Sequence, residues 1–341
     1  MIGIDISDRS IKIVWLTNTK PQEYVAHYLG DMPKGIMENG MILDKKQLEQ
    51  ALRQALAHCK IPEKSSETFV FSIPETQSFL RVLEVPAMEE DEISEAIRWE
   101  VAQHIPIGIE NMYIDWQPII SGIHKTGSGK QEIQVGTAQR KIVDSLYSLL
   151  EPFQFDVAAF ELESQAIVRS LISEELRARQ GIVIIDLGGT ATNVIIHDHG
   201  AMRFTASLER GLFAALSVLT EDEQKSLGDY KTLSEDQQQT IAAKLAPVSD
   251  ELAVEVGSIA EFYGSIDTQH EVKEIILTGG GSNLPTLEQA FLRHFDNVHM
   301  QRGNPWVNVV NEHATHRLPV ELTDSVRYST ALGLALRPVI L

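Results

Sequence analysis

Hydrophobic and polar residues alternate in a similar way at two distant places in the chain. Ile2–Leu16 (IGIDISDRSIKIVWL) and Ile182–His197 (IVIIDLGGTATNVIIH) each begin with an apolar run, continue through an acid and a small or polar turn, and end in an alternating run. This order predicts two β-hairpins, with Asp5 and Asp186 at the ends of their first strands. Two such hairpins about 180 residues apart indicate a duplicated, two-lobed α/β molecule.

A third apolar run is followed by three consecutive glycines. Glu274–Thr278 (EIILT) predicts a strand, Gly279–Asn283 (GGGSN) a tight turn, and the periodicity of residues 284–291 a helix. Glycines let a backbone approach a ligand closely, and the start of a helix offers free N–H groups. The segment therefore predicts a turn that can contact a ligand.

The remaining apolar patterns predict further helices and strands, among them a βαββ-like unit over residues 83–140 that is inserted into the first half. Asp44 is a candidate N-cap of the first helix. The predicted helices are 44–59, 89–104, 139–150, 160–179, most of 213–265 and 325–336, and the other predicted strands are 68–73, 112–120 and 131–138.

Composition narrows the class of protein. The 341 residues are 43% hydrophobic and 23% charged, which is typical of a globular chain and argues against disorder. The net charge of −19 repels phosphate backbones and disfavours a nucleic-acid partner. The single cysteine, Cys59, excludes an internal disulfide. No apolar run reaches the roughly 18 residues that span a bilayer, and the first residues lack signal-peptide features, so we expect a cytoplasmic protein.

The second hairpin turn has the residues that a nucleotide requires. Phosphates need backbone N–H donors, small residues for close approach, and a carboxylate that holds Mg²⁺, often through water. Asp186 followed by Gly188, Gly189 and Thr190 offers this combination, although a plain β-turn uses the same residues. The order of the two hairpins and the glycine turn favours phosphate binding. The sequence contains no P-loop, dinucleotide fingerprint, nucleophile elbow or zinc-protease motif.

Four further stretches are distinctive: Pro33–Gly40 (PKGIMENG), Ile73-Pro74 with Val85-Pro86, Ile97–Pro106 (IRWEVAQHIP) with Asp115 after it, and Arg327–Ala335 (RYSTALGLA). The order of hairpin, insertion, second hairpin and glycine turn resembles the actin-like ATPase superfamily. Within that superfamily, the four stretches resemble the PilM family of type IV pilus assembly, which is itself similar to the cell-division protein FtsA. The resemblance covers nearly the whole chain.

The resemblance implies an actin-like, ribonuclease H-like duplicated fold of two α/β lobes with an inserted FtsA-type βαββ-like subdomain. The last helix would return toward the first lobe. The implied divisions are 1–82 and 141–180 for the first-lobe core, 83–140 for the insertion, 181–212 and 273–341 for the second-lobe core, and 213–272 for a helical subdomain.

The resemblance also implies ATP and Mg²⁺ between the lobes. Asp5 and Asp186 would hold Mg²⁺ through water. Gln165 falls where actins place the glutamine that positions the attacking water, so Gln165 and Asp186 are the implied catalytic pair; the alternative for Gln165 is a helix residue that faces solvent. The implied nucleotide contacts are Ser7, Ser10, Lys12, Gly188, Gly189 and Thr190 for the phosphates, and Lys225, Gly279, Gly280, Gly281 and Ser282 for the adenosine end.

Two departures from the superfamily pattern bear on nucleotide binding. Where glycine usually opens the first turn, this chain has Ser7, followed by Asp8 and Arg9. A side chain at position 7 crowds a phosphate, and an inward Asp8 would oppose it unless Arg9 offsets the charge or Asp8 faces solvent. Near Lys225, Asp222 stands where the superfamily usually has glutamate. We therefore expect weak nucleotide binding, and the sequence leaves hydrolysis open.

By the same resemblance, the chain is expected to be a cytoplasmic adaptor that binds the N-terminal cytoplasmic tail of the inner-membrane protein PilN. The tail would bind between the first lobe and the insertion, and ATP would set the angle of the lobes. Other inner-membrane platform proteins and self-association are further expectations, with the membrane reached only indirectly. Two alternatives are an FtsA-like filament former and a small-molecule kinase. A kinase needs another catalytic acid, and we identify none at a strand end besides Asp5 and Asp186.

Overall fold

The computed structural model describes the chain except residues 20–21, 87, 89, 105–107, 120–129, 178, 180, 267–270, 296, 310–319 and 339–341. The described strands form two large sheets and a small two-stranded one. The first large sheet has the order β10-β6-β1-β2-β3, and its strands are β1 (Ile2–Ser7), β2 (Ser10–Leu16), β3 (Tyr24–Asp31), β6 (Thr68–Ile73) and β10 (Asp156–Leu162).

The second large sheet has the order β15-β14-β11-β12-β13-β7-β9-β8. Its strands are β7 (Ser78–Pro86), β8 (Met112–Pro118), β9 (Lys130–Gln139), β11 (Ile182–Leu187), β12 (Thr192–Asp198), β13 (Ala201–Leu208), β14 (Glu274–Thr278) and β15 (His299–Arg302). The small sheet pairs β4 (Met37–Glu38) with β5 (Met41–Ile42).

Both predicted hairpins are present, and each has the same arrangement of neighbouring strands. β1 pairs antiparallel with β2 and parallel with β6, just as β11 pairs antiparallel with β12 and parallel with β14. The first turn is tight, because Ser7 pairs with Ser10, whereas four residues separate Leu187 from its partner Thr192. This repeated pairing confirms the duplication that the sequence predicts.

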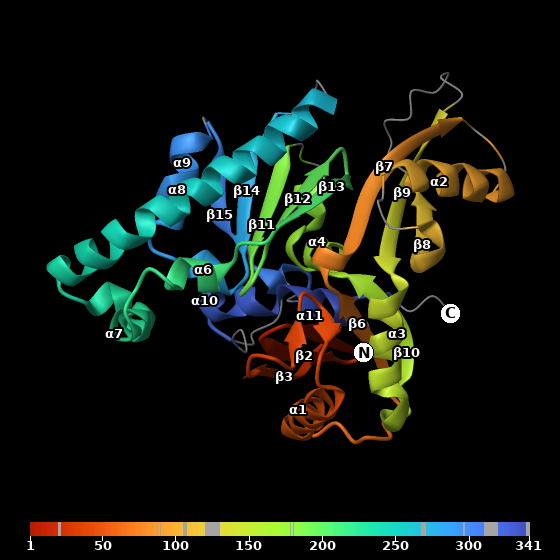
Figure 1. Ribbon diagram of the computed structural model, residues 1–341, viewed down its shortest axis with the longest axis horizontal. Coiled ribbons are helices and arrows are strands. Elements are labelled where there is room, and N and C mark those ends of the chain that lie inside the picture. Colours follow the sequence, from red (N-terminus) through yellow and green to blue (C-terminus); the bar gives the residue numbers. More distant parts are fainter. Residues whose placement is uncertain are drawn as a thin grey trace.

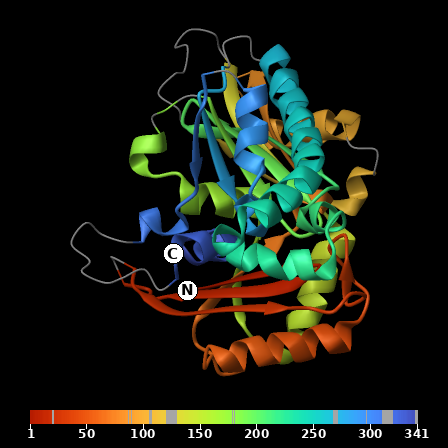
Figure 2. The same cartoon turned by 90° about the vertical axis from the view of Figure 1, so that its left-hand side faces the viewer.

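Helices cover both faces of the first sheet. In Figure 2, α1 (Lys45–His58) lies under the strands, while α11 (Ser329–Ala335) lies above them. Asp44 caps α1 as predicted, because its carboxylate accepts the backbone N–H of Gln47. A Cβ on Gly3 would overlap the carbonyl of Ala331, so glycine lets α11 lie directly on β1. The other α-helices of the first half are α3 (Arg140–Leu150), α4 (Glu163–Leu171) and α5 (Glu174–Arg177).

The helical part of the second half begins with two short helices and continues into a long one. The 32-residue α8 (Glu235–Ile266) crosses the outer face of the second sheet beside α9 (Figure 1). Its apolar side packs with the buried strand residues in one core. The remaining α-helices are α6 (Leu212–Leu216), α7 (Glu221–Ser226), α9 (Leu287–His294) and α10 (Leu322–Ser325).

The expected insertion has the order β7, α2 (Glu90–His104), β8, β9, which is the predicted βαββ order. β7 begins at Ser78, before the expected boundary at 83. The three strands continue the sheet of the second lobe, with β7 beside β13. Among the described residues, no helix has the length and apolar character needed to cross a membrane.

Candidate functional site

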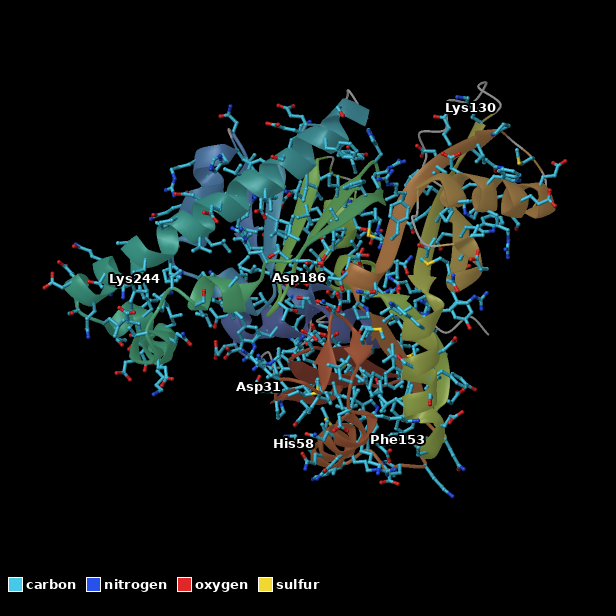
Figure 3. The ribbon with its side chains drawn as sticks, viewed as in Figure 1. Asp31, His58, Lys130, Phe153, Asp186 and Lys244 are labelled. Atoms are coloured by element: carbon cyan, nitrogen blue, oxygen red, sulfur yellow. The ribbon has the colours of Figure 1, made fainter. Side chains whose placement is uncertain are left out.

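Two carboxylates lie where the two halves of the molecule meet (Figure 3 labels Asp186). Asp5 lies near the end of β1 and is 2% exposed. Its cross-strand partner on β2 is Lys12, whose Nζ lies 2.7 Å from Asp5 Oδ2. Ser72 of β6 donates its hydroxyl to Asp5 Oδ1 at 2.9 Å. The parallel β1–β6 pair and the β1–β2 hairpin thus fix this carboxylate from both sides.

Two glutamates adjoin this centre. Glu163 starts α4 directly after β10, and its Oε2 accepts the Asn193 amide at 3.1 Å and the backbone N–H of Glu75 at 3.3 Å. Glu75 is buried, and its Oε2 accepts the backbone N–H of Ser164 at 3.2 Å. The first-lobe glutamates are therefore joined to each other and, through Asn193, to the second hairpin.

Burial and excess negative charge at this centre shift the pKa values of its side chains. Burial raises the pKa of Asp186 to about 6; Lys12 opposes this rise and Asp5 adds to it. Burial and the charges of Asp5, Asp186 and Glu75 raise the pKa of Glu163 well above its ordinary value. Burial lowers the pKa of Lys12, but Asp5, Asp186 and Glu163 outweigh it and raise that pKa overall. Within this cluster one lysine faces four carboxyl groups, and a bound divalent cation would relieve the repulsion.

The acidic side chains at this centre do not form a site that coordinates a metal ion directly. No three acid, histidine or cysteine side chains converge closely enough to hold an ion directly, within the part of the chain that the structure describes. Mg²⁺ commonly keeps several of its waters and uses only one or two carboxylates. The arrangement therefore fits a hydrated Mg²⁺ held by Asp5 and Asp186 through water, as the resemblance implies.

The first turn settles the orientation of Asp8. Its two carboxylate oxygens accept the backbone N–H groups of Asn39 at 2.9 Å and Gly40 at 3.0 Å. The carboxylate thus holds the segment after β4, and Asp8 also lines the cavity between the two turns. Ser7 and Ser10 face each other, with their hydroxyl oxygens 3.0 Å apart. Both predicted serines therefore lie at the mouth of this turn.

The second turn is packed against the start of α6. Gly188 and Gly189 accept the backbone N–H groups of Leu212 and Phe213 at 2.8 Å and 2.9 Å, and a Cβ on Gly189 would press into the Phe213 ring. The Arg9 guanidinium lies 4.7 Å from the centroid of the same ring. Phe213 therefore contacts both hairpin turns, a bridge that the sequence did not reveal.

The glycine turn lies next to Asp186. Gly279 has φ of +80°, and a Cβ there would overlap Oδ1 of Asp186, so only glycine fits this close approach. A Cβ on Gly281 would overlap the Leu187 side chain, and the buried Ser282 hydroxyl donates to the Gly279 carbonyl at 2.7 Å. Gly280 begins a 3₁₀ turn. The α-helix starts only at Leu287, later than the sequence suggested.

Two further predicted residues, Lys225 and Gln165, lie on helices. Lys225 is on α7, which Figure 1 places at the far end of the helical part from the hairpins, and its side chain is 75% exposed beside Asp222. Gln165 lies on α4, two positions after Glu163. Glu163, which was not predicted, lies at the centre, where it lines the cavity between the turns and accepts the Asn193 amide. The same signal used for Asp5 would have found it, because Glu163 follows the last residue of β10.

A cavity of about 200 Å³ lies between the two hairpin turns. Among the described residues that line it are four acids and no lysine or arginine. Its volume is below the roughly 300–1,000 Å³ of ordinary ligand sites. The cavity therefore suits a small cationic group, such as a hydrated divalent cation, better than a whole nucleotide. The lining includes Ser7, Asp8, Glu75, Glu163, Thr190 and Glu209.

Comparisons with known proteins agree with this geometry. The sequence profile of the family described as type IV pilus assembly protein PilM matches residues 3–339. A solved "PilM-PilN type IV pilus biogenesis complex" is similar with a TM-score of 0.77 and 21% identity over 98% of this chain and 97% of that chain. The ethanolamine utilization protein EutJ from Carboxydothermus hydrogenoformans is similar with a TM-score of 0.58 and 14% identity, over 98% and 88%. These likenesses confirm the actin-like two-lobed fold.

Proposed function

The chain belongs to the family of type IV pilus assembly protein PilM, and from this premise we propose that it is an ATP-binding adaptor that binds the N-terminal tail of PilN. Support for the partner comes from the similar solved chain, which is part of a PilM-PilN complex. Through that partner the adaptor would reach the inner membrane. An extended tail would add its backbone to a sheet edge, with its side chains in pockets between the first lobe and the inserted subdomain.

The observation that carries nucleotide binding is the acid centre between two hairpin turns. Asp5 and Asp186 would hold Mg²⁺ through water, and Lys12 would balance the charge of the phosphates. The turn residues would face those phosphates, whereas Gly279 to Ser282 would lie along the nucleotide toward adenosine. Bound Mg²⁺ supplies positive charge that neutralises both the phosphates and these acids. The raised pKa of Asp186, caused first by burial, supports this assignment.

Turnover of ATP would need a group that orients water toward the terminal phosphate. Glu163 lines the cavity between the turns, and its carboxylate is fixed by Asn193 and by the backbone of Glu75. We propose that Glu163 fills the orienting role that the resemblance gave to Gln165. Lys225 is left out of the proposed nucleotide site because of its exposure on α7.

Nucleotide and tail would be coupled through the angle of the lobes. If ATP changes the affinity for the tail by some factor, the tail must change the affinity for ATP by the same factor. Calorimetric titration of Mg-ATP into the wild type and into Asp186→Ala, with and without a synthetic PilN tail peptide, tests both parts. We expect binding in the wild type, loss of binding in the variant, and a mutual effect of the two ligands. Two ligands that bind without any mutual effect would refute the coupling.

A further inference from the structure

The inserted subdomain is built onto the sheet of the second lobe. β7 pairs with β13 between Arg81 and Phe204, and β9 and β8 continue outward from β7 (Figure 1). The sheet of the first lobe is separate from this eight-stranded sheet. Although β7 follows the first-lobe strand β6 in the sequence, its neighbour in the sheet belongs to the second lobe. We call the contacts of β7 and β9 with β13 the seam.

Two polar side-chain contacts reinforce the seam. Gln134 of β9 is 6% exposed, and its amide donates to the backbone carbonyl of Met202 at 2.8 Å. Arg203 is 9% exposed and lies 2.7 Å from the carboxylate of Glu132 on β9, while its Nε donates to the carbonyl of Asp198 at 3.1 Å. Breaking a buried contact of this kind leaves a polar group without a partner, so the seam resists separation.

Apolar packing joins the base of the inserted subdomain to both lobes. Leu80 of β7 and Ala138 of β9 share a core with Ile184, Ile195 and Met202 of the second lobe. First-lobe residues of β6, β10 and α4 belong to the same core, namely Ile73, Leu162, Ile167 and Leu171. Farther out, α2 packs on β7 and β9 in a core made only of residues of the inserted subdomain, within the described part of the chain: Val85, Ile93, Ile97, Val101, Ile133 and Val135, with Leu83, Met88, Ile114 and Trp116 at its border.

Contacts of this outer part with the first-lobe helix α3 are exposed and polar. Tyr113 of β8 donates its hydroxyl to Asp144 at 2.9 Å, and the Arg140 guanidinium lies 4.2 Å from the centroid of the Tyr113 ring. Exposed pairs of this kind contribute little to stability and can exchange with water. The buried polar contacts of the inserted subdomain therefore lie at the seam, whereas its polar contacts with α3 are exposed.

We propose that the inserted subdomain moves as one body with the second lobe when nucleotide changes the angle of the lobes. The seam then carries nucleotide state to the tail site, because the space between the inserted subdomain and the first lobe changes with that angle. This inference rests on the proposed function. It explains how a tail bound next to the first lobe responds to a ligand held between the lobes without contacting it.

Distances between fluorescent labels test which parts move together. Burial raises the pKa of Cys59 to about 11, so that thiol is unreactive and labelling at neutral pH reaches introduced, exposed cysteines. Glu95→Cys on α2 is paired with Gln50→Cys on α1 in one protein and with Glu288→Cys on α9 in another. On addition of Mg-ATP, we expect energy transfer to shift in the α2–α1 pair and to stay constant in the α2–α9 pair. The reverse pattern, or constant transfer in both pairs, would overturn the inference.

The double variant Glu132→Ala/Gln134→Ala, called the seam variant, tests whether the seam couples nucleotide binding to the affinity for the tail. The matched control is Glu84→Ala, because Glu84 lies opposite Glu132 on β7 and pairs with Lys130 inside the inserted subdomain. We expect the ratio of tail affinities with and without Mg-ATP to fall toward one in the seam variant and to stay within about twofold of wild type in the control. An unchanged ratio in the seam variant would contradict the inference. Failure of the wild type to bind Mg-ATP or tail in the same titrations would instead refute the proposed function.

Discussion

Asp186→Asn is expected to stabilise the protein without ligand at neutral pH and to remove its response to Mg-ATP. Burial, opposed by Lys12 and reinforced by Asp5, raises the pKa of Asp186 from 3.8 to about 6. The folded state therefore holds this proton more tightly than the unfolded chain does. Asparagine has nearly the same shape and cannot ionise, so it avoids the repulsion that the ionised carboxylate meets at neutral pH.

The sign and size of the effect follow from proton linkage. Because the folded pKa is raised, the contribution of Asp186 is fully favourable below about pH 4 and is lost as the pH rises through about 6. A raise of this size corresponds to at most about 3 kcal/mol of unfolding free energy near neutral pH, and partial exposure of the carboxylate reduces it. Asp186→Asn should therefore gain stability at about pH 7 and little at about pH 4.

Urea unfolding at both pH values measures this difference, with Asp229→Asn, at an exposed position on the helical part, as the control. Mg-ATP at 100 times its dissociation constant should stabilise the wild type by about 2.7 kcal/mol and leave Asp186→Asn unchanged. Equal destabilisation of the variant at both pH values would show that Asp186 has a structural role, and would refute the assignment of a strained, cation-binding carboxylate.

Three further predictions concern substitutions at this site. Gly279→Ala should lower the unfolding free energy by about 1–3 kcal/mol in urea titrations, since its φ is positive and its Cβ would overlap a carboxylate, whereas Gly228→Ala, at an open position, should have little effect. Asp8→Ala should lower it by about 1–3 kcal/mol, because two backbone N–H groups lose their acceptor, and an unchanged value would contradict this role. Glu163→Gln should retain Mg-ATP binding by calorimetry and reduce phosphate release about 100-fold or more; a loss only in Gln165→Ala would return the role to that residue.

Local patterns predicted the parts of the molecule that local physics determines. An apolar run, an acid and a turn specify a hairpin whatever surrounds it, so the strands that present Asp5 and Asp186 followed from the sequence. The same holds for the cap of α1 by Asp44 and for the βαββ order of the insertion. The actin-like arrangement of these parts came from the family resemblance, because periodicity alone does not specify which strands become neighbours.

The features that were not predicted depend on contacts between distant segments. Asp8 binds the backbone at Asn39 and Gly40, more than thirty positions away, so neither its turn nor its charge revealed its orientation. Phe213 reaches both hairpin turns from the start of α6. The neighbours of β7 were equally hidden, since β7 continues the chain of the first lobe and joins the sheet of the second. Glu163 is different, because its position at a strand end was visible and was overlooked.

The repulsion between carboxylates at the acid centre and the contacts at the seam together indicate how a bound ligand would act on the inserted subdomain. Asp186 and Glu163 have raised pKa values because burial and neighbouring carboxylates disfavour their ionised forms. That repulsion lowers stability, and under the proposed function a bound cation would relieve it, so the protein would favour different states with and without Mg-ATP. Asn193 of the second hairpin holds Glu163 of the first lobe, and Gln134 holds the inserted subdomain to the second. In the proposed mechanism, a change in charge at the acid centre would be transmitted to the inserted subdomain through the sheet that contains β12, β13, β7 and β9.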